Sequence, residues 1–508
     1  MRKIIHRVIA AALAAAATPA SAAWFEAKTT HFLILADESP RDLQEFAIKL
    51  EKFDKAVRTV RQMDDPPIGN AGRLTIFVLK DTDAVSKTAV GKSSAIAGFY
   101  IPRASGSIAF VPRRTDGSAA WDMSADNVFF HEYAHHLMLQ NTDASLPPWL
   151  VEGFAEFFSS AEFPRNGSVQ LGMPANHRMP GLYLLNRLKI EDLVGEGLPD
   201  NARDEVTEVF YGRAWLLTHY LTFSDKRRGQ LASYVTQVRS GTPVLTAARN
   251  VFGDLNKLDR DMDAYLDGNR FTYLTVNASQ FASIGASVRA LRPGEAAIMP
   301  IVVQSRRGVD SKTAPQVAAL ARSVAAQYPD DPAVQRALAE AEYDEHNYAA
   351  AEQAADRALV RDPALAKGMI YKGLAEMQLA RGNPKADWDA IRANFIRANK
   401  LDTEDPEPLM LYYESFRRQG KQPPQAAVDG LLYALVLAPQ DQSLRSMAVA
   451  ELISADRVAE AREAIAPLAF NPHSGKGREW ARKVLAALNT NNSKAALAAL
   501  SADDGGAD

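Results

Sequence analysis

The segment His131-Glu-Tyr-Ala-His135 constrains this chain more than any other short stretch, because it follows the pattern H-E-x-x-H in a sequence typical of a helix. Side chains four residues apart lie on one face of a helix, so the two imidazoles can be presented to a single metal ion. Glu132 projects from the same turn, beside the ion rather than toward it. Two nitrogen ligands with a carboxylate that can accept a proton from water predict a zinc hydrolase site.

A second helix is predicted directly after a polar, proline-marked turn over 141–148. Pro148 suits the first turn of this helix, where its missing N–H leaves no bond unmade. Glu152 and Glu156 are four residues apart and share one face of a helix that is otherwise strongly apolar. Burying these carboxylates is costly unless they bind a metal or a paired group. The pair therefore indicates a metal-binding face, and the alternative is a solvated one.

The order H-E-x-x-H, a short connection and then Trp149-Leu-Val-Glu152-Gly-Phe-Ala resembles the gluzincin branch of zinc peptidases, the clan of thermolysin and the zinc aminopeptidases. The resemblance implies a Zn²⁺ cofactor with Glu152 as third ligand. It also implies that Glu156 holds a ligating histidine by a hydrogen bond. Gly153 is expected to let the two helices approach closely. Residues 24 to about 221 resemble, more weakly, the peptidase-MA-like domains of exported bacterial proteins.

Further site residues are suggested by the same resemblance. Aminopeptidase relatives carry a tyrosine that stabilises the oxyanion of the tetrahedral intermediate, and the match implies this role for Tyr211, whose alternative role is a core aromatic. Arg213 and His219 are lesser candidates. His136 is expected only to flank a ligand, and His177 to lie at the surface.

The strand before the zinc helix departs from the aminopeptidases. Those relatives bind the substrate's free amine with a glutamate on an edge strand, whereas residues 106–112 here contain no acidic side chain. We therefore expect an endopeptidase-like site, at which an extended substrate pairs with this strand through backbone hydrogen bonds. Ser124 or Asp126 is expected to cap the zinc helix.

The first 22 residues are typical of a secretory signal, with Arg2, Lys3 and Arg7 before a short apolar run and a small-residue cleavage pattern. The apolar run is too short to span a bilayer comfortably, so we expect no stable membrane insertion. An uncleaved membrane anchor is the alternative. The chain has no cysteine, which excludes cysteine-ligated zinc and cysteine-protease chemistry. An exported bacterial protein, periplasmic or secreted, is expected.

Charge excludes one class of partner. The full chain carries a net charge of −3, and removal of a signal with three basic and no acidic residues leaves −6. Basic runs are absent from the sequence, so nucleic-acid binding is not expected.

The length of 508 residues predicts two or three domains. Strands are predicted at 31–36 and 74–79, a helix at 40–61 and a hairpin at 97–112. The fold class is an α+β zincin-like domain with a mixed sheet, followed by an all-α tetratricopeptide-like domain. The predicted segments are a signal peptide (1–22), the zincin-like domain (23–267), a small connecting module (268–310), helical repeats (311–500) and a disordered tail (501–508), with a separable boundary near 305–315.

The repeats are predicted from an alanine-rich pattern bracketed by Asp331-Pro332 and Asp362-Pro363. The stretch 383–405 interrupts the period, and a generic helical bundle is the alternative. Stacked repeats would form a concave surface for a protein partner. Small and aromatic residues fall where such repeats pack their helices: Leu338, Ala339, Tyr348, Ala351, Ala358, Ala427 and Ala434.

Two functions are consistent with these features. The first is a zinc-dependent peptidase with a peptide or protein substrate, in which Glu132 is the general base and Tyr211 stabilises the oxyanion. The second is a non-catalytic binding protein with a degenerate zincin scaffold and working repeats. A weaker third interpretation keeps the zinc but hydrolyses another amide, such as one of the cell wall.

Overall fold

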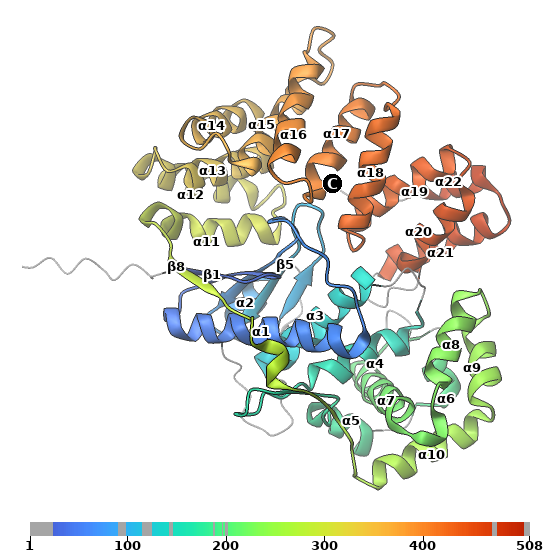
Figure 1. The fold of residues 1–508 in the computed structure, drawn as a ribbon. Coiled ribbons are helices and arrows are strands. Elements are labelled where there is room, and N and C mark those ends of the chain that lie inside the picture. Colours follow the sequence, from blue (N-terminus) through green and yellow to red (C-terminus); the bar gives the residue numbers. More distant parts are fainter. Residues whose placement is uncertain are drawn as a thin grey trace, which may run out of the picture.

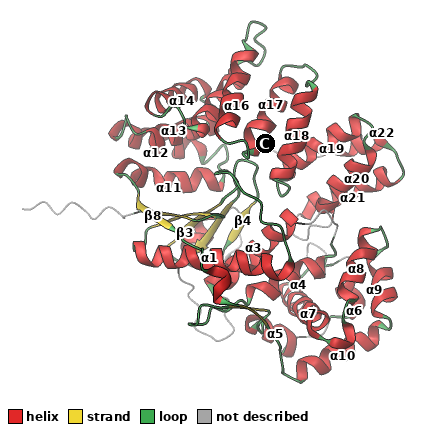
Figure 2. Ribbon diagram, viewed as in Figure 1, coloured by secondary structure: helices red, strands yellow, loops and turns green. Residues whose placement is uncertain are grey.

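The computed structural model describes residues 24–89, 98–113, 124–141, 146–185, 188–195, 197–198, 202–469 and 475–501. The predicted signal peptide and all but the first residue of the predicted tail lie outside these residues. Helices dominate the described chain, and a single larger sheet lies among them (Figure 2). No described helix is both long enough and apolar enough to cross a membrane.

A six-stranded mixed sheet forms the centre of the N-terminal part, in the order β4-β5-β3-β2-β1-β8. Strands β2, β3 and β5 run parallel, and β1, β4 and β8 are antiparallel to their neighbours. The predicted mixed sheet, its two strands and the hairpin are therefore confirmed. The strands are β1 (Phe25–Lys28), β2 (Phe32–Ala36), β3 (Leu74–Leu79), β4 (Phe99–Ile101), β5 (Ile108–Pro112) and β8 (Ser287–Ala290).

Helices cover both faces of this sheet (Figure 1). Side chains alternate between the two faces along a strand, so Ile76 of β3 packs toward α1 (Pro40–Arg61) and α3 (Ala125–Asn141). The next residue, Phe77, packs toward the opposite layer, which begins with α11 (Pro293–Arg307). Both faces are thus fully used for packing.

The second layer corrects the predicted division of the chain. Residues 268–310 do not form a small connecting module, because β8 pairs with β1 as the edge of the main sheet and α11 covers that sheet. β7 (Leu274–Val276) pairs instead with β6 (Val169–Leu171). Residues that the sequence assigned to a linker therefore complete the N-terminal fold, and the boundary near 305–315 lies inside a shared core.

A group of helices below the sheet carries the second half of the candidate site. The most closely packed of these are α4 (Pro148–Ser159) and α7 (Asp204–Phe223), which pack side by side. The other elements of this region are η1 (Asn176–Arg178), α5 (Met179–Tyr183), α6 (Ile190–Val194), η2 (Asp225–Arg227), α8 (Gln230–Arg239), α9 (Val244–Phe252), α10 (Leu255–Asp267) and η3 (Ala278–Phe281). The short helix α2 (Thr82–Thr88) lies instead against β3 and β5 of the sheet.

The C-terminal part is all helical, as predicted, and bends as an arc around one end of the sheet (Figure 1). The first helices of successive pairs begin at 332, 366, 406, 442 and 475, at intervals of 34, 40, 36 and 33 residues, near the period of about 34 residues in tetratricopeptide repeats. The helices are α12 (Ala314–Gln327), α13 (Pro332–Asp344), α14 (Tyr348–Arg361), α15 (Ala366–Leu379), α16 (Trp388–Leu401), α17 (Pro406–Arg418), α18 (Gln425–Leu437), α19 (Gln442–Ser454), α20 (Val458–Ala469), α21 (Gly475–Asn489) and α22 (Ser493–Ser501).

The stretch 383–405 interrupts the repeat period, as predicted, but it does not interrupt the stack of helices. This stretch contains α16, which packs between α15 and α17 like the other second helices. The longer interval of 40 residues contains the extended loop before Trp388. The predicted packing alanines Ala339, Ala351 and Ala358 are all buried.

Candidate metal centre

The helix α3 is anchored at its start and along its length. The Ser124 hydroxyl accepts a hydrogen bond from the Asn127 backbone N–H at 3.1 Å, so Ser124 is the cap. Asp126 instead forms an ion pair with Lys49 of α1 at 2.6 Å. One turn on, the Phe130 ring stacks on Phe53 of α1 with ring centroids 4.1 Å apart. These contacts fix the helix that carries His131 and His135.

The helix α4 approaches α3 from the other side and presents its two glutamates. Pro147 occupies the cap position, and the helix begins at Pro148 as predicted. Gly153 permits a close approach, but to α7 rather than to α3, because a Cβ atom there would lie 2.5 Å from the Ala214 carbonyl oxygen. The glycine thus brings α7, with Tyr211, close to the candidate ligands.

The three predicted ligands meet at one buried point. His131, His135 and Glu152 are 7%, 6% and 1% exposed. The two Nε2 atoms are 3.1 Å apart, and each lies 3.5 Å from Oε2 of Glu152. One ligand atom from each residue lies within 4.8 Å of the others. Donor atoms bound to one tetrahedral zinc ion are about 3.3–3.5 Å apart, so these residues fit the metal that the sequence predicts.

Glu156 lies directly behind this point. Its Oε1 is 3.1 Å from Nδ1 of His131, and its Oε2 is 2.8 Å from Nε2 of His177. Arg178 donates to Oε1 at 2.6 Å and to Glu208 at 2.6 Å. Burial raises the pKa of Glu156, but Arg178 and His131 outweigh it and hold that pKa well below its usual range. The carboxylate is therefore ionised and fixes the orientation of the His131 ring.

The electrostatics of the centre favour a cation. Burial lowers the pKa of His131, but the nearby Glu156 and Glu152 carboxylates outweigh this effect and raise it to about 10. The same negative surroundings that hold a proton on the ring would attract a metal ion in its place.

Tyr211 lies at the edge of the centre. Its ring centroid is 6.2 Å from that of His131, and the Arg178 guanidinium lies 5.0 Å over its face. Burial raises the pKa of the Tyr211 hydroxyl, and the negative charges of Glu152 and Glu132 raise it further. The hydroxyl is therefore protonated and can donate a hydrogen bond. Glu132 is half-buried in the same surroundings.

Two lesser candidates take no part in the centre. The Arg213 guanidinium pairs with Asp259 and Asp263 of α10, which makes it a link between helices. The His219 ring lies 3.1 Å and 3.0 Å from the carbonyl oxygens of Gly172 and Thr272. Burial lowers the pKa of His219 to about 4, so this ring is a neutral core residue.

Sequence reasoning missed His177 and Arg178. Both belong to η1, a single turn of 3-10 helix without a sequence motif, and only the fold brings this turn against Glu156. The expectation that His177 lies at the surface is wrong, since its side chain is 5% exposed.

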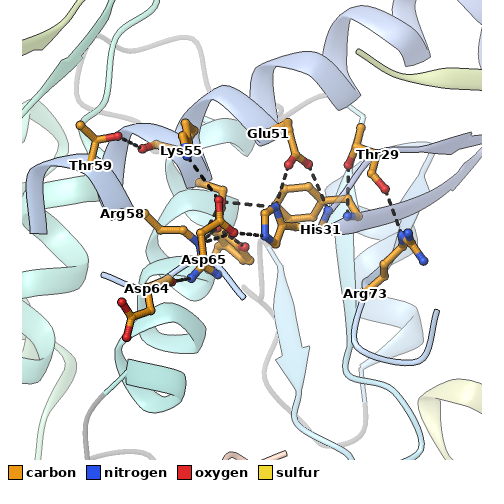
Figure 3. A network of polar contacts seen from close by, with 12 residues as sticks. Thr29, His31, Glu51, Lys55, Arg58, Thr59, Asp64, Asp65 and Arg73 are labelled. Carbon is orange, nitrogen blue, oxygen red and sulfur yellow. Dashed lines mark hydrogen bonds and ion pairs between the residues drawn. The ribbon is translucent and has the colours of Figure 1, made fainter. Parts of the chain in front are cut away.

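A second polar cluster lies on the far side of α3 and resembles a metal site only superficially. His31, Asp54 and Asp65 are close enough to share an ion, but Arg58 donates to both oxygens of Asp54, at 2.8 Å and 3.0 Å. Lys55 pairs with Asp65 at 3.3 Å (Figure 3). These cations already neutralise the carboxylates. The Tyr133 hydroxyl also donates to Asp54 at 2.8 Å, so this cluster ties α3 to α1.

One protein family matches the part of the sequence that contains the candidate metal ligands. A family described as a protein of unknown function (DUF1570) matches residues 127–244, which include the candidate ligands of both helices. No curated protein matches the chain. Among solved structures, the chain is similar to a thermophilic TPR protein of Thermus thermophilus, with 16% identity, a TM-score of 0.32 and coverage of 40% of this chain and 99% of that chain. The family description assigns no activity.

Proposed function

We propose that this protein is a zinc-dependent peptidase whose metal is held by His131, His135 and Glu152. The observation that carries the proposal is the convergence of two imidazole nitrogens and one carboxylate oxygen at 3.1–3.5 Å in a buried site. Such a cluster of ligand atoms is expensive to bury unless a cation joins them.

Each remaining residue of the centre has a role in hydrolysis. Bound zinc would supply Lewis acidity for the scissile carbonyl and for water. Glu132 accepts the proton of the attacking water and passes it to the leaving amine. Tyr211 donates a hydrogen bond to the carbonyl oxygen as negative charge develops there. Glu156, held by Arg178, keeps the His131 ring in place.

The position of β4 supports cleavage within a peptide chain. β4, rather than β5, is the last strand of the sheet at the end nearest α3, so it is the strand available for pairing. Its residues Phe99-Tyr-Ile101 include no carboxylate that could bind a substrate's free amine. An endopeptidase with an extended substrate is therefore the preferred form of the proposal.

Zinc content and peptide hydrolysis test the proposal together. The purified wild type should contain about one zinc per chain and cleave casein or a peptide library. His135→Ala should lose the metal. Glu132→Gln should retain it but hydrolyse more slowly by a factor of about a hundred or more. The matched control is Glu162→Gln, an exposed glutamate of the same domain. A zinc-loaded wild type without hydrolysis of any amide would favour the binding-protein alternative, and full zinc in His135→Ala would refute the ligand assignment.

A further inference from the structure

Side chains of the helical repeats form hydrogen bonds with the backbone of the turn between β4 and β5. Asp441, the cap of α19, accepts a hydrogen bond from the Ala104 backbone N–H at 2.6 Å, and Lys367 of α15 donates to the Ser105 carbonyl oxygen at 3.0 Å. Ala104 is 1% exposed, in a cluster with Tyr413 and Leu431 of α17 and α18. The hairpin beside the candidate site is thus bound by the repeats through its backbone.

From this contact a chain of hydrogen bonds runs to α3. Gln440 Nε2 lies 3.2 Å from Ser107 Oγ, which lies 3.1 Å from the Tyr100 hydroxyl. That hydroxyl is 2.7 Å from Nδ1 of His136. Ser107 Oγ accepts from the Tyr100 hydroxyl, from the Gln440 amide and, at 3.3 Å, from the Arg103 backbone N–H.

This series of hydrogen bonds ends at His136, the residue next to a candidate ligand. His136 follows His135 directly, and its ring also stacks on Tyr133 with centroids 5.4 Å apart. Gln440, Ser107 and His136 are 8%, 5% and 4% exposed. Water therefore has little access to these groups, and without the Tyr100 hydroxyl Nδ1 of His136 would lose a buried hydrogen-bond partner. These hydrogen bonds thus constrain how this turn of α3 packs against the edge of the sheet.

We propose that Tyr100 and Gln440 are positioning residues, through which the helical repeats fix the turn of α3 that presents the metal ligands. The inference rests on the proposed metal centre and extends it, because it makes the repeats part of that centre's support. Ligand atoms 3.1–3.5 Å apart tolerate little movement of their helix before one of them leaves the metal. The repeats would then act on the site from inside the same chain, in addition to any partner they bind.

The test measures metal affinity in the full chain with conservative variants. Tyr100→Phe removes one hydroxyl, and Gln440→Met removes the amide while keeping the length of the side chain. Each should weaken Co²⁺ and Zn²⁺ binding about tenfold in chelator competition, as for other groups that support metal ligands. Because both variants interrupt the same series of hydrogen bonds, the double variant should bind metal no more weakly than Tyr100→Phe alone. The Co²⁺ absorption spectrum should change in the same variants, which a merely structural contact would not cause.

Matched controls lie elsewhere in the repeats. Tyr433→Phe removes a hydroxyl that contacts Glu404, and Gln425→Met changes an amide that contacts Asp429. Both should bind metal like the wild type. Wild-type affinity in Tyr100→Phe and Gln440→Met would overturn the proposal, as would strictly additive losses. If the wild type binds no cobalt, the proposed function fails instead. In that case the ring ¹⁵N chemical shifts of His136 test the positioning proposal separately. A change in these chemical shifts that Gln440→Met causes in the wild type, but not in a Tyr100→Phe background, supports the proposal. No change on Gln440→Met refutes it.

Discussion

Glu156 joins the candidate ligands to the rest of the domain through its contacts with His131, His177 and Arg178. The resemblance to gluzincin peptidases implied a hydrogen bond from Glu156 to a ligating histidine, and spacing alone placed Glu152 and Glu156 on one face of their helix. Neither predicted the other two contacts, because η1 lies beyond the connection after α4 and carries no recognisable motif. Side chains that share one helix face could thus be assigned from spacing, and the contact between the two helices from the resemblance, whereas contacts made only by chain folding could not.

Tyr211 gives the first prediction at the residue scale. Tyr211→Phe should keep the metal and the fold, because only the hydroxyl is lost and the ring still packs beside Arg178. The rate kcat should fall by about 10²-fold, in line with the loss of one oxyanion donor, while KM changes little. Steady-state kinetics on one peptide substrate measure this split. The control is Tyr183→Phe, an exposed tyrosine of α5, and an unchanged kcat in Tyr211→Phe would remove Tyr211 from the mechanism.

His31 gives a prediction about pH. Burial lowers the pKa of His31, but Glu51 and Asp54 outweigh burial and raise it above 6.5. A raised histidine pKa contributes stability that is complete below about pH 6.5 and is lost as the pH rises through the higher folded-state value. His31→Gln should therefore cost about 1.5–3 kcal/mol at pH 6 and progressively less toward pH 9. Thermal unfolding across this range measures the difference.

The partners of His31 and the control complete this test. The charged groups facing His31 are Glu51, Asp54, Arg58 and Asp65, all from α1 and the loop after it (Figure 3). His346→Gln, at an exposed position before α14, is the control. A cost of His31→Gln that is constant or grows with pH would contradict the raised pKa.

At the scale of elements, the contact between α4 and α7 decides where Tyr211 lies. Gly153→Ala would push a Cβ atom into the Ala214 carbonyl oxygen and the Thr218 side chain. Overpacking of this kind costs about 1–3 kcal/mol, more than the gain of about 1 kcal/mol from alanine's helix propensity. We expect a lower Tm and a loss of hydrolysis, because α7 must move.

The matched control for this variant is another glycine inside a helix. Gly430 lies in α18, where the nearest atom to an added Cβ is 3.6 Å away, an ordinary contact. Gly430→Ala should raise the Tm slightly through helix propensity. Equal or higher stability of Gly153→Ala would show that α4 and α7 are not closely packed at this point.

Local patterns account for the elements that were predicted. α1 begins at Pro40 and ends at Arg61, as the sequence predicts, because a Ser39 cap and an amphipathic period specify it. β8 was missed because its role is set by pairing with β1, some 260 residues earlier in the chain. α11 was missed because its apolar residues serve the sheet rather than its neighbours in sequence, and its internal Pro300 argues against a helix.

At the scale of the whole molecule, the repeats are structurally continuous with the sheet. α11 and α12 share a core with β3 and β5, and the loop before α19 binds the β4–β5 turn. Asp402, at the end of α16, also accepts the backbone N–H groups of Asn70 and Ala71. Part of the repeat surface that we predicted to bind a protein partner is therefore occupied by contacts within the same chain.

Truncation tests this continuity. A chain of residues 24–267 lacks β8 and α11, so it exposes the face of the sheet formed by Leu35, Phe77 and Phe110. Exposed apolar faces of this size lead to aggregation, and we expect an insoluble or zinc-free product. A chain of residues 24–501 keeps β8, α11 and the loop that binds the hairpin turn, and it should remain monomeric and zinc-loaded. Size-exclusion chromatography, circular dichroism and zinc content compare the two. A folded, zinc-loaded 24–267 fragment would show that the N-terminal part is independent, and that the repeats only lie against it.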